Sequence, residues 1–425
     1  MGGRVESGAS RAAVSVVVLV GTLAAVYMVS QFLRNSVGVI APDLAAELDL
    51  SASQVGILSS VFFFAFAAAQ LPLGIAIDRY GPKACMVVCA GVVVVGTALF
   101  AAAETASGAI AARALMGLGT SCYLMAPLAL YAREFPPERF SILAGIQLGL
   151  GTTGALLATA PLAYVAAGIG WRATFLGVTA VMAATGLLVA AAVKESAPHA
   201  TATRPESLRA SIVGVREALR TVSVGPVFFM QMANYSSVVL IAGLWGGPYL
   251  THVYGYGLAE RGTILLVPVL AQMAGSLVWG SADRLFTSYK LPILTGALAT
   301  GALLAWLAFA GAPPIAVLVA WLCLFGLFAA YTPVLIAHGK SLFPPRLIGR
   351  GMTLLNMGTM GGVFVSQTLT GAAIDLFPAQ DGAYPLAAYR LTFAIQAVFV
   401  AVAVVAYLRA HDPRRAAVSS TLTPP

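Results

Sequence analysis

Two arginines lie inside long apolar stretches of the sequence, where charged side chains are rare. Arg34 and Arg113 each stand in a run of apolar residues long enough to cross a membrane. An intramembrane charge is costly, so each arginine is a candidate for function by default. A guanidinium presents a planar fork of donors that matches a carboxylate or a phosphate. None of the 16 acids lies mid-membrane to neutralise the two cations, so both predict a site for an anion.

Each arginine also has a structural interpretation. The helix that carries Arg34 can end near Gly38, in which case the side chain snorkels to the headgroups at the membrane surface. Arg113 is followed by Gly117 and Gly119, so its guanidinium can instead bond to the backbones of closely packed helices. We prefer binding for Arg34, and for Arg113 both interpretations stay open.

Uncharged polar residues at membrane depth extend the candidate site. Tyr27, Gln31 and Arg34 follow the spacing i, i+4, i+7 and therefore share one helix face. Such side chains must face protein or water, which predicts a cavity lining, although hydrogen bonds between helices would account for some of them. The other candidates for contact with a substrate are Tyr123, Gln147, Gln231, Asn234, Tyr235, Tyr331 and Asn356, and Gln272 and Gln367 complete the polar groups at this depth.

The composition explains why these polar groups stand out. The chain has 425 residues, of which 59% are hydrophobic and 9% are charged, against about 25% charged in ordinary soluble domains. One helical crossing takes about 20 apolar residues, so the apolar content corresponds to roughly twelve crossings. We therefore expect an all-α membrane protein, which excludes a soluble enzyme, a disordered chain and a disulfide scaffold.

The twelve predicted crossings fall into two sets of six. A polar linker over residues 194–224 separates residues 1–193 from residues 225–410, and residues 411–425 form a tail that we expect to be disordered in the cytoplasm. Within the linker, Leu208–Leu219 predicts a short amphipathic helix at the membrane surface. The first set is Ala12–Ile40, Ser53–Ile77, Ala84–Ala103, Ala106–Tyr131, Ser141–Ala167 and Ala173–Val193, and the second is Pro226–Tyr249, Gly262–Ala282, Leu291–Ala310, Ile315–Ile336, Gly351–Leu376 and Leu391–Leu408.

Basic residues are distributed unevenly among the loops. Of the 24 lysines and arginines, 19 stand in the termini, the linker and alternate loops, and only Arg172, Arg261 and Arg390 stand in the other loops. The positive-inside rule then places both termini and the linker in the cytoplasm. The net charge of +8 is thus an orientation signal toward a lipid bilayer rather than a sign of nucleic-acid binding. We expect a multi-pass protein of a bacterial-type inner (plasma) membrane.

The two sets of crossings resemble each other at a nearly constant offset. The pair Asp78-Arg79 returns as Asp283-Arg284, 205 residues later. The run Phe-Pro-Pro at 135–137 returns at 343–345, 208 residues later. An internal repeat of six helices is how many transporters build two bundles around a central site. The repeat therefore predicts two pseudo-symmetric six-helix bundles.

The loop after the second predicted crossing carries the motif Gly74-x-x-x-Asp78-Arg79-x-Gly81-x-Lys83. This motif resembles the loop motif of the major facilitator superfamily, and the resemblance covers essentially the whole chain. It implies the major facilitator fold, with Asp78 and Arg79 as a latch. The carboxylate would hold the positive N-terminus of a neighbouring helix in one state and release it in the other.

The remaining motifs depart from the family in part. The second copy of the loop motif contains Asp283 and Arg284 and is also a candidate gate. It matches the motif less completely, because its glycine stands one position closer to the aspartate and the Gly-x-Lys is missing. The run from Arg113 to Gly119 resembles the second motif of the family, an intramembrane arginine followed by glycines. The fifth crossing lacks the Gly-Pro pattern that is typical of many proton-driven drug antiporters.

The stretch from Arg34 to Pro42, together with Gln70-x-Pro72-x-Gly74, is similar to the organic-anion and sugar-phosphate branches of the family. In those branches an arginine of the first helix binds the anionic group of the substrate. Organic-anion symporters usually carry acids in the first and fourth helices, and these are missing here. Their absence favours exchange or uniport over carboxylate-mediated proton symport, although His338 could carry a proton.

We therefore expect a secondary transporter that moves a small organic solute, a carboxylate or phosphate anion, by alternating access. Its partners would be that solute, a proton or a counter-substrate, and the lipid bilayer; we expect a monomer that binds no nucleic acid. The sequence has no nucleotide-binding loop, zinc-type histidine cluster or nucleophile elbow, so we expect no enzyme activity, cofactor or metal. The alternatives are proton-driven efflux of drug-like or siderophore compounds, amino-acid uptake, and a transporter-shaped substrate sensor.

Overall fold

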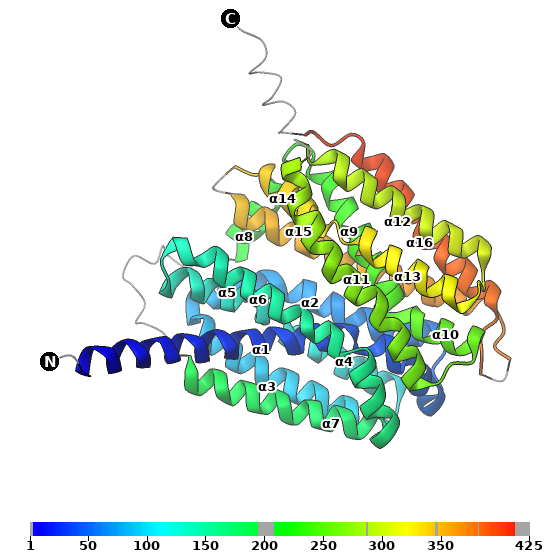
Figure 1. The fold of residues 1–425 in the computed structure, drawn as a ribbon, viewed down its shortest axis with the longest axis horizontal. Coiled ribbons are helices and arrows are strands. Elements are labelled where there is room, and N and C mark those ends of the chain that lie inside the picture. The colour runs from blue at the N-terminus through cyan, green and yellow to red at the C-terminus, as the bar shows by residue number, and fades with distance from the viewer. Residues whose placement is uncertain (1–2, 194–207, 286–287, 345–346, 381, 413–425) are drawn as a thin grey trace, which may run out of the picture.

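The computed structural model describes residues 3–193, 208–285, 288–344, 347–380 and 382–412, and within these ranges the chain forms helices and no β-strand (Figure 1). Ten of the helical segments are long and apolar enough to cross a membrane. The other two predicted crossings are the helix α15 and the segment in which α6 continues into the first part of α7. The prediction of an all-α membrane chain is confirmed.

Two crossings of the first half are broken. The fourth is interrupted at Ser121, between α4 and α5, and the fifth is interrupted between α6 and α7. The helix α7 then turns at Gly170, whose φ of 80° is a conformation that glycine adopts readily, and continues as the sixth crossing. The helices of this half are α1 (Gly3–Leu48), α2 (Ala52–Tyr80), α3 (Pro82–Ala101), α4 (Ala106–Thr120), α5 (Cys122–Glu134), α6 (Pro137–Leu157) and α7 (Ala160–Ala192).

The second half repeats this plan. Its first crossing contains a π-helical turn, and its fourth is broken between α13 and α14. The amphipathic helix predicted in the linker is present over the predicted residues as α8 (Leu208–Leu219), whereas residues 194–207 of the linker and 413–425 of the tail lie outside the described residues. The other elements are α9 (Val224–Leu240), η1 (Ile241–Trp245), α10 (Gly246–Tyr254), α11 (Leu258–Leu285), α12 (Lys290–Ala310), α13 (Ile315–Ala329), α14 (Thr332–Ser341), α15 (Ile348–Ile374) and α16 (Leu386–Tyr407).

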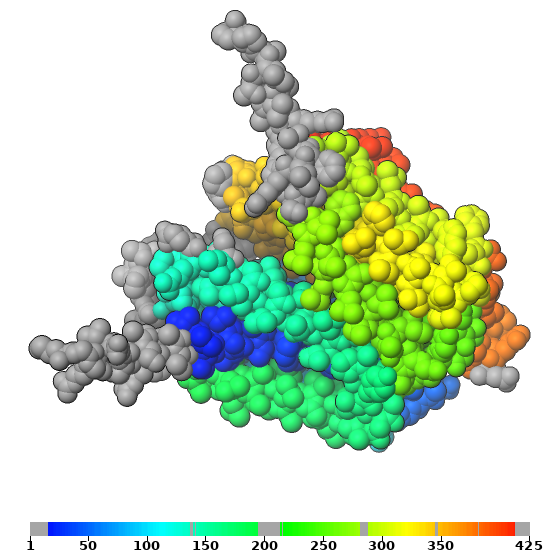
Figure 2. Space-filling view, viewed as in Figure 1, coloured from blue at the N-terminus to red at the C-terminus, as the bar shows by residue number. Residues whose placement is uncertain are grey.

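The same helix pairings occur in both halves. In the first half, α1 packs on α6, α2 on α4, and α3 on α7; in the second, α9 packs on α15, α11 on α13, and α12 on α16. These are corresponding crossings of the two sets, so the repeat in the sequence is also a repeat in the packing. Figure 1 shows α1 to α7 below α9 to α16, and in Figure 2 the two halves meet along a seam across the visible face.

Local signals explain several helix boundaries. The Ser51 hydroxyl accepts from the backbone N–H of Gln54, and the Gln54 side chain accepts from the Ser51 N–H, which starts α2 with a capping box. Gly81, with φ 86°, ends α2, and Pro82 occupies the first turn of α3. The predicted end of the first crossing at Ile40 was wrong. The helix α1 accommodates a proline and runs on to Leu48, because its last turns pack against η1 and α10.

The main contacts between the two halves are those of α2 with α15, of α7 with α11, and of α1 with η1 and α10; α11 also touches α1 and α6. Several of these contacts lie where α1 ends and α2 begins, and we call this end of the molecule the closed end. The opposite end, where α2 ends, we call the linker end, because α8 lies there against both α2 and α15.

Candidate functional site

Arg34 is a buried cation on α1. Its side chain is 5% exposed, and its guanidinium carbon lies 4.4 Å from the centre of the Phe66 ring on α2, a cation–π contact. Its Nε has no hydrogen-bond partner, and among the described residues Arg34 makes no ion pair. The helix end near Gly38, on which the alternative of snorkelling depended, is absent, because α1 continues to Leu48.

Tyr27 and Gln31 lie on the same face of α1 as Arg34, as their spacing predicted. The Tyr27 ring packs against Gly151 of α6, where any Cβ would collide with the ring. Arg34 and, from α9, Tyr235 both lie within electrostatic reach of the Tyr27 hydroxyl. The Oε1 atom of Gln31 is buried and has no hydrogen-bond partner. The structure thus brings Tyr27, Arg34 and Tyr235 together from the two halves.

Arg113 is fully buried and joins three helices. Its Nη1 donates to the Leu33 carbonyl of α1 at 2.8 Å, and its Nε donates to the Leu58 carbonyl of α2 at 3.5 Å. The guanidinium also lies over the Phe62 ring, 4.7 Å from its centre. These contacts match the structural interpretation, in which the arginine braces helix backbones. Contact with a ligand through Nη2, which has no partner, stays a prediction.

Gln147 is a fully buried tie between α1 and the fourth crossing. Its Nε2 donates to the Leu23 carbonyl of α1 at 2.9 Å, and its Oε1 accepts from the Tyr131 hydroxyl of α5 at 3.0 Å. Both ends of the amide are therefore engaged by the protein. Gln147 therefore forms hydrogen bonds between helices, the structural alternative to lining a cavity.

Asn234 and Gln231 of α9 are also bonded to neighbouring helices. The Nδ2 of Asn234 donates to the Ala329 carbonyl at 3.1 Å, and its Oδ1 accepts from the Thr332 hydroxyl at 2.7 Å. Asn234 thereby holds the break between α13 and α14. The Oε1 of Gln231 accepts from the Thr359 hydroxyl of α15 at 3.3 Å. In this conformation both amides stabilise the second half.

The remaining residues predicted to contact a substrate differ in how deeply they are buried. Tyr123 is fully buried and its hydroxyl has no partner. Tyr331 is equally buried, donates to the sulfur of Met230 at 3.6 Å, and packs its ring against Gly296 of α12. Asn356 on α15 is half-buried, as Tyr235 is, so both keep some exposed surface.

Several buried polar atoms without a hydrogen-bond partner lie outside the predicted contact set. In the sequence, Gln367 is one of many polar residues in the apolar runs, and a serine within an apolar helix does not by itself indicate a binding site. What distinguishes them is the unmet hydrogen-bonding capacity, which only the three-dimensional structure reveals. The side chains concerned are those of Ser30 on α1, Ser59 and Gln70 on α2, and Gln367 on α15.

At the closed end, Asp375 joins the second half to the first. It follows α15, and its Oδ1 and Oδ2 accept from the backbone N–H groups of Ala52 and Ser53, both at 2.9 Å, at the start of α2. The Tyr384 hydroxyl donates to Oδ1 at 2.9 Å. Burial on its own raises the pKa of Asp375, but the hydrogen bonds from Ser53 and its neighbours outweigh this effect and hold the pKa below its ordinary value.

A second polar link joins the halves at the same end. Arg261 of α11 donates through Nε to the Val39 carbonyl of α1 at 2.7 Å and pairs through Nη2 with the carboxylate of Asp43. The arginine is 3% exposed on its side chain, so the pair is largely shielded from solvent on that side. Two of the three basic residues predicted at this end, Arg172 and Arg261, are therefore engaged by acids of α1, the former through Glu47.

Glycines allow backbone contact between α1 and the seventh crossing. A Cβ on Gly38 would lie 2.6 Å from the carbonyl carbon of Gly243 in η1. A Cβ on Gly247 of α10 would collide with the Gly38 carbonyl oxygen. The two helices therefore meet at this point with no side chain between them.

At the linker end, Asp78 is exposed and lies 3.5 Å from Nη2 of Arg133 on α5. Its neighbour Arg79 lies over the Tyr80 ring of the same helix. In this conformation Asp78 pairs within its own half. The side chains of the second motif copy lie outside the described part of the chain; they are Asp283 and Arg284.

His338, the titratable group named for proton transfer, is sealed inside the second half. Its Nε2 donates to the His411 carbonyl at 2.9 Å, so Nδ1, 2.6 Å from the Tyr407 oxygen, accepts from that hydroxyl. The imidazole also stacks on the Tyr289 ring. It faces α16 and the segment after it, and is fully buried.

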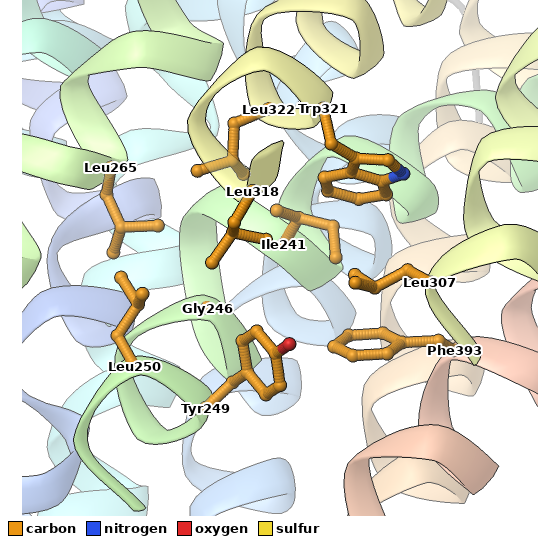
Figure 3. Close-up of a pocket in the computed structure, with 10 residues that line it drawn as sticks. All are labelled: Ile241, Gly246, Tyr249, Leu250, Leu265, Leu307, Leu318, Trp321, Leu322 and Phe393. Carbon is orange, nitrogen blue, oxygen red and sulfur yellow. The ribbon is translucent and has the colours of Figure 1, made fainter. Parts of the chain in front are cut away.

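A small pocket lies within the second half (Figure 3). Its lining is apolar, with room for about one water molecule. The pocket holds none of the predicted contact residues and has no charge to orient a polar solute. Its lining includes Ile241, Gly246, Tyr249, Leu265, Trp321 and Phe393.

Comparison with known proteins decides the family. The family model of the Major Facilitator Superfamily matches residues 23–257 and 227–423. The chain belongs to this superfamily. One similar solved structure is a bacterial homologue of the human lysosomal transporter Spinster, in an inward-facing and unoccupied conformation. Its TM-score is 0.77 at 16% sequence identity, and the match covers 96% of this chain and 98% of the homologue. A nucleoside transporter NupG mutant has a TM-score of 0.74 at 14% identity, covering 92% and 99%. These likenesses confirm the major facilitator fold.

Curated relatives match part of the chain. The probable sulfoacetate transporter SauU of Cupriavidus necator is 23% identical over 279 residues, which is 63% of this chain and 65% of that protein. The multidrug resistance protein MdtL of Escherichia fergusonii is 27% identical over 218 residues, or 49% of this chain and 55% of that protein. The chain thus spans less than two thirds of either relative. The chain is a multi-pass membrane protein of this superfamily.

Proposed function

We propose that this secondary transporter of the major facilitator type carries a small, water-soluble organic anion. The observation that supports the proposal is the enclosed guanidinium of Arg34, which has no acid to neutralise it among the described residues. A buried charge without a partner is costly, and an incoming carboxylate, sulfonate or phosphate would supply one. The name of one relative, a probable sulfoacetate transporter, is that of an organic-anion transporter and agrees with this substrate class.

The contacts suggest a division of roles among the candidate residues. Arg34 binds the anionic group, and Tyr27, Gln31 and Tyr235 hydrogen-bond the rest of the solute. Arg113 is a positioning residue, because it bonds the carbonyl of the residue before Arg34. The remaining candidates shape the site and change partners as the halves rock. Four of them bond to neighbouring helices in this conformation, namely Gln147, Gln231, Asn234 and Tyr331, and Tyr123 and Asn356 complete the set.

Transport follows alternating access, in which the two halves rock around the site. We assign the closed end to the outside of a bacterial-type inner membrane and the linker end to the cytoplasm, following the distribution of basic residues. The conformation is then inward-facing, and Asp78, Arg79, Asp283 and Arg284 serve as gates when the cytoplasmic end closes. Cysteines placed at positions 196 and 419 should react with impermeant reagents from the inside alone; labelling from outside contradicts this orientation.

For coupling, we propose exchange or uniport by a monomer. No carboxylate of the described residues accompanies Arg34, and His338 is engaged at both ring nitrogens within one half. The substrate-induced pH change in lightly buffered proteoliposomes tests this point. A stoichiometric proton signal would replace exchange with proton symport.

A second candidate function is proton-driven efflux of drug-like compounds. The similarity to the multidrug resistance protein MdtL favours it. A lipophilic compound would use the aromatic and methionine side chains of the interior and would not need Arg34. The two functions therefore predict opposite results for one substitution.

The test is a thermal-shift screen of the purified chain against organic acids, sulfonates, sugar phosphates, amino acids and drugs. An anion should stabilise the wild-type chain, Arg34→Ala should abolish that stabilisation, and Arg34→Lys should weaken it, because lysine lacks the planar fork. If the best ligands are neutral or cationic, or tolerate Arg34→Ala unchanged, the anion proposal fails and the efflux function takes its place.

A further inference from the structure

Gln367 is the most anomalous polar side chain of α15. It is fully buried, and neither Nε2 nor Oε1 of its amide has a hydrogen-bond partner in the part of the chain that the structure describes. Buried amides are normally bonded at both ends. Gln396 on α16, which is equally buried, donates to Ser236 and Ser237 and accepts from Ser366. The unmet amide of Gln367 therefore requires an explanation.

The first step is the position of Arg34 relative to α2. Arg113 donates to the Leu33 carbonyl and to the Leu58 carbonyl, so these two backbone groups lie within the span of one guanidinium. The following residues on the two helices are Arg34 and Ser59. Ser59, whose buried hydroxyl also has no partner, therefore stands beside the turn of α1 that carries Arg34.

The second step is the position of Gln367 relative to the same turn of α2. The hydroxyls of Ser60 and Thr368 lie 3.1 Å apart across the seam between the halves. A Cβ on Gly56 would lie 2.6 Å from the carbonyl oxygen of Gln367, so the backbones touch there. Ser59 is thus flanked along α2 by two contacts with the Gln367 region of α15.

The third step is the direction of the side chains. Helical side chains lean toward the N-terminus of their own helix. Both α1 and α15 end at the closed end, so Arg34 and Gln367 both lean away from it. The Arg34 guanidinium lies over Phe66 of α2, and Phe364, one turn before Gln367, packs against Phe64 with ring centres 5.1 Å apart. The two heads therefore lie at similar depth along α2, one from each half.

We propose that Gln367 binds the substrate from the second half, so that the solute held by Arg34 at its anionic group is hydrogen-bonded at its other end by the Gln367 amide. This inference rests on the proposed function and names the substrate class. One unpaired guanidinium matches one anionic group, because Arg113 is engaged by carbonyls. An amide both donates and accepts, and so it matches a neutral hydroxyl or carbonyl group. The class is a small monoanion with a neutral hydrogen-bonding group, such as a hydroxy acid.

The experiment compares acids that differ by one hydroxyl, glycolate with acetate and lactate with propionate, by calorimetric titration of the full purified chain. The wild-type chain should bind each hydroxy acid at least tenfold more tightly than its partner, because a buried amide left unpaired rejects the analogue without the hydroxyl. Gln367→Leu should bring this ratio close to one, with the binding of acetate and propionate within threefold of wild type. Gln367→Asn, a shorter amide, should give an intermediate ratio.

Gln380→Leu, in the exposed loop after α15, is the matched control and should leave the ratio unchanged. Gln367→Leu should not lower the melting temperature of the empty chain, since it removes two unmet polar atoms from an apolar environment. An unchanged ratio in Gln367→Leu, an equal loss of both acids, or a wild-type ratio near one overturns the role of Gln367. Binding of these acids that survives Arg34→Ala overturns the proposed function instead, so the two failures are distinguishable.

Discussion

The hydrogen bonds between Asp375 and the first turn of α2 hold the closed end together, and Asp375→Asn should weaken that closure. The carboxylate accepts from two backbone N–H groups of the other half, both at 2.9 Å. An asparagine keeps one acceptor oxygen but loses the second bond and the charge at the helix N-terminus. A hydrogen bond to a charged group contributes about 1.5–3 kcal/mol, and the charge about 0.3–1 kcal/mol. Asp375 is exposed and solvent weakens both contributions, so we expect less than their sum, about 1–2 kcal/mol, which is a factor of roughly 5–30 in the open-to-closed ratio.

The assay is the rate at which a thiol reagent labels Ser60→Cys in purified protein. Ser60 is fully buried and lies against Thr368 across the seam, so its labelling requires the closed end to open. The exposed Cys323 is replaced by alanine beforehand. In the Asp375→Asn variant the rate should rise by roughly 5–30-fold. Glu104→Gln removes another exposed acid, one that makes no ion pair among the described residues, and should leave the rate unchanged.

Closure through Asp375 should also depend on pH. Because the pKa of Asp375 lies below its ordinary value in the closed form, its contribution to closure is complete above that ordinary value. It is lost as the pH falls through the lowered pKa. Because thiolate is lost at low pH in both backgrounds, the readout is the ratio of the two labelling rates. Labelling in the wild-type background should stay slower than in the Asp375→Asn background from neutral to mildly acidic pH, and the difference should vanish below. A rate in Asp375→Asn within twofold of wild type would refute the role of these bonds.

Three further predictions concern the first half of the chain. Arg113→Lys should destabilise the chain by about 1–3 kcal/mol, because an ammonium cannot span two helices as the guanidinium does; an unchanged melting temperature would contradict the brace. Asp78→Asn should slow transport into proteoliposomes while leaving anion binding intact, and wild-type turnover would exclude the latch. Gly154→Ala should cost about 1–3 kcal/mol, since its Cβ would collide with the Met28 carbonyl. Gly149→Ala, with open space around it, is the matched control and should melt as wild type does.

The fold could be predicted from the sequence because it depends on properties averaged over many residues. Apolar content fixes the number of crossings, and the offset of about 205–208 residues between motif copies predicts the repeated pairing of helices. The helix α8 was placed correctly because its amphipathic period is local. The end of α1 was misplaced because its last turns, which include Pro42, pack against η1 and α10, and contacts between distant segments are not visible in a local pattern. The division at residues 194–224 stays a prediction.

The candidate site could be predicted in part from the sequence. The spacing of Tyr27, Gln31 and Arg34 places them on one face of any helix, so that face could be predicted. The partners of Gln147 could not, because one of them is a backbone carbonyl, which every residue carries. The same holds for Arg113. The lack of hydrogen-bond partners for the Gln367 amide could not be predicted either, because it depends on how the helices pack in the folded chain.

The glycine contact between α1 and the seventh crossing has a practical consequence. Where two backbones meet directly, one added methyl group acts as a wedge, and no side chain is present that could rotate out of its way. A single substitution, Gly247→Ala, should then deny the chain its present conformation while leaving the interior of each half untouched. Such a trapped form would offer the opposite conformation for crystallisation or for the selection of conformation-specific antibodies, without a ligand or a chemical cross-link.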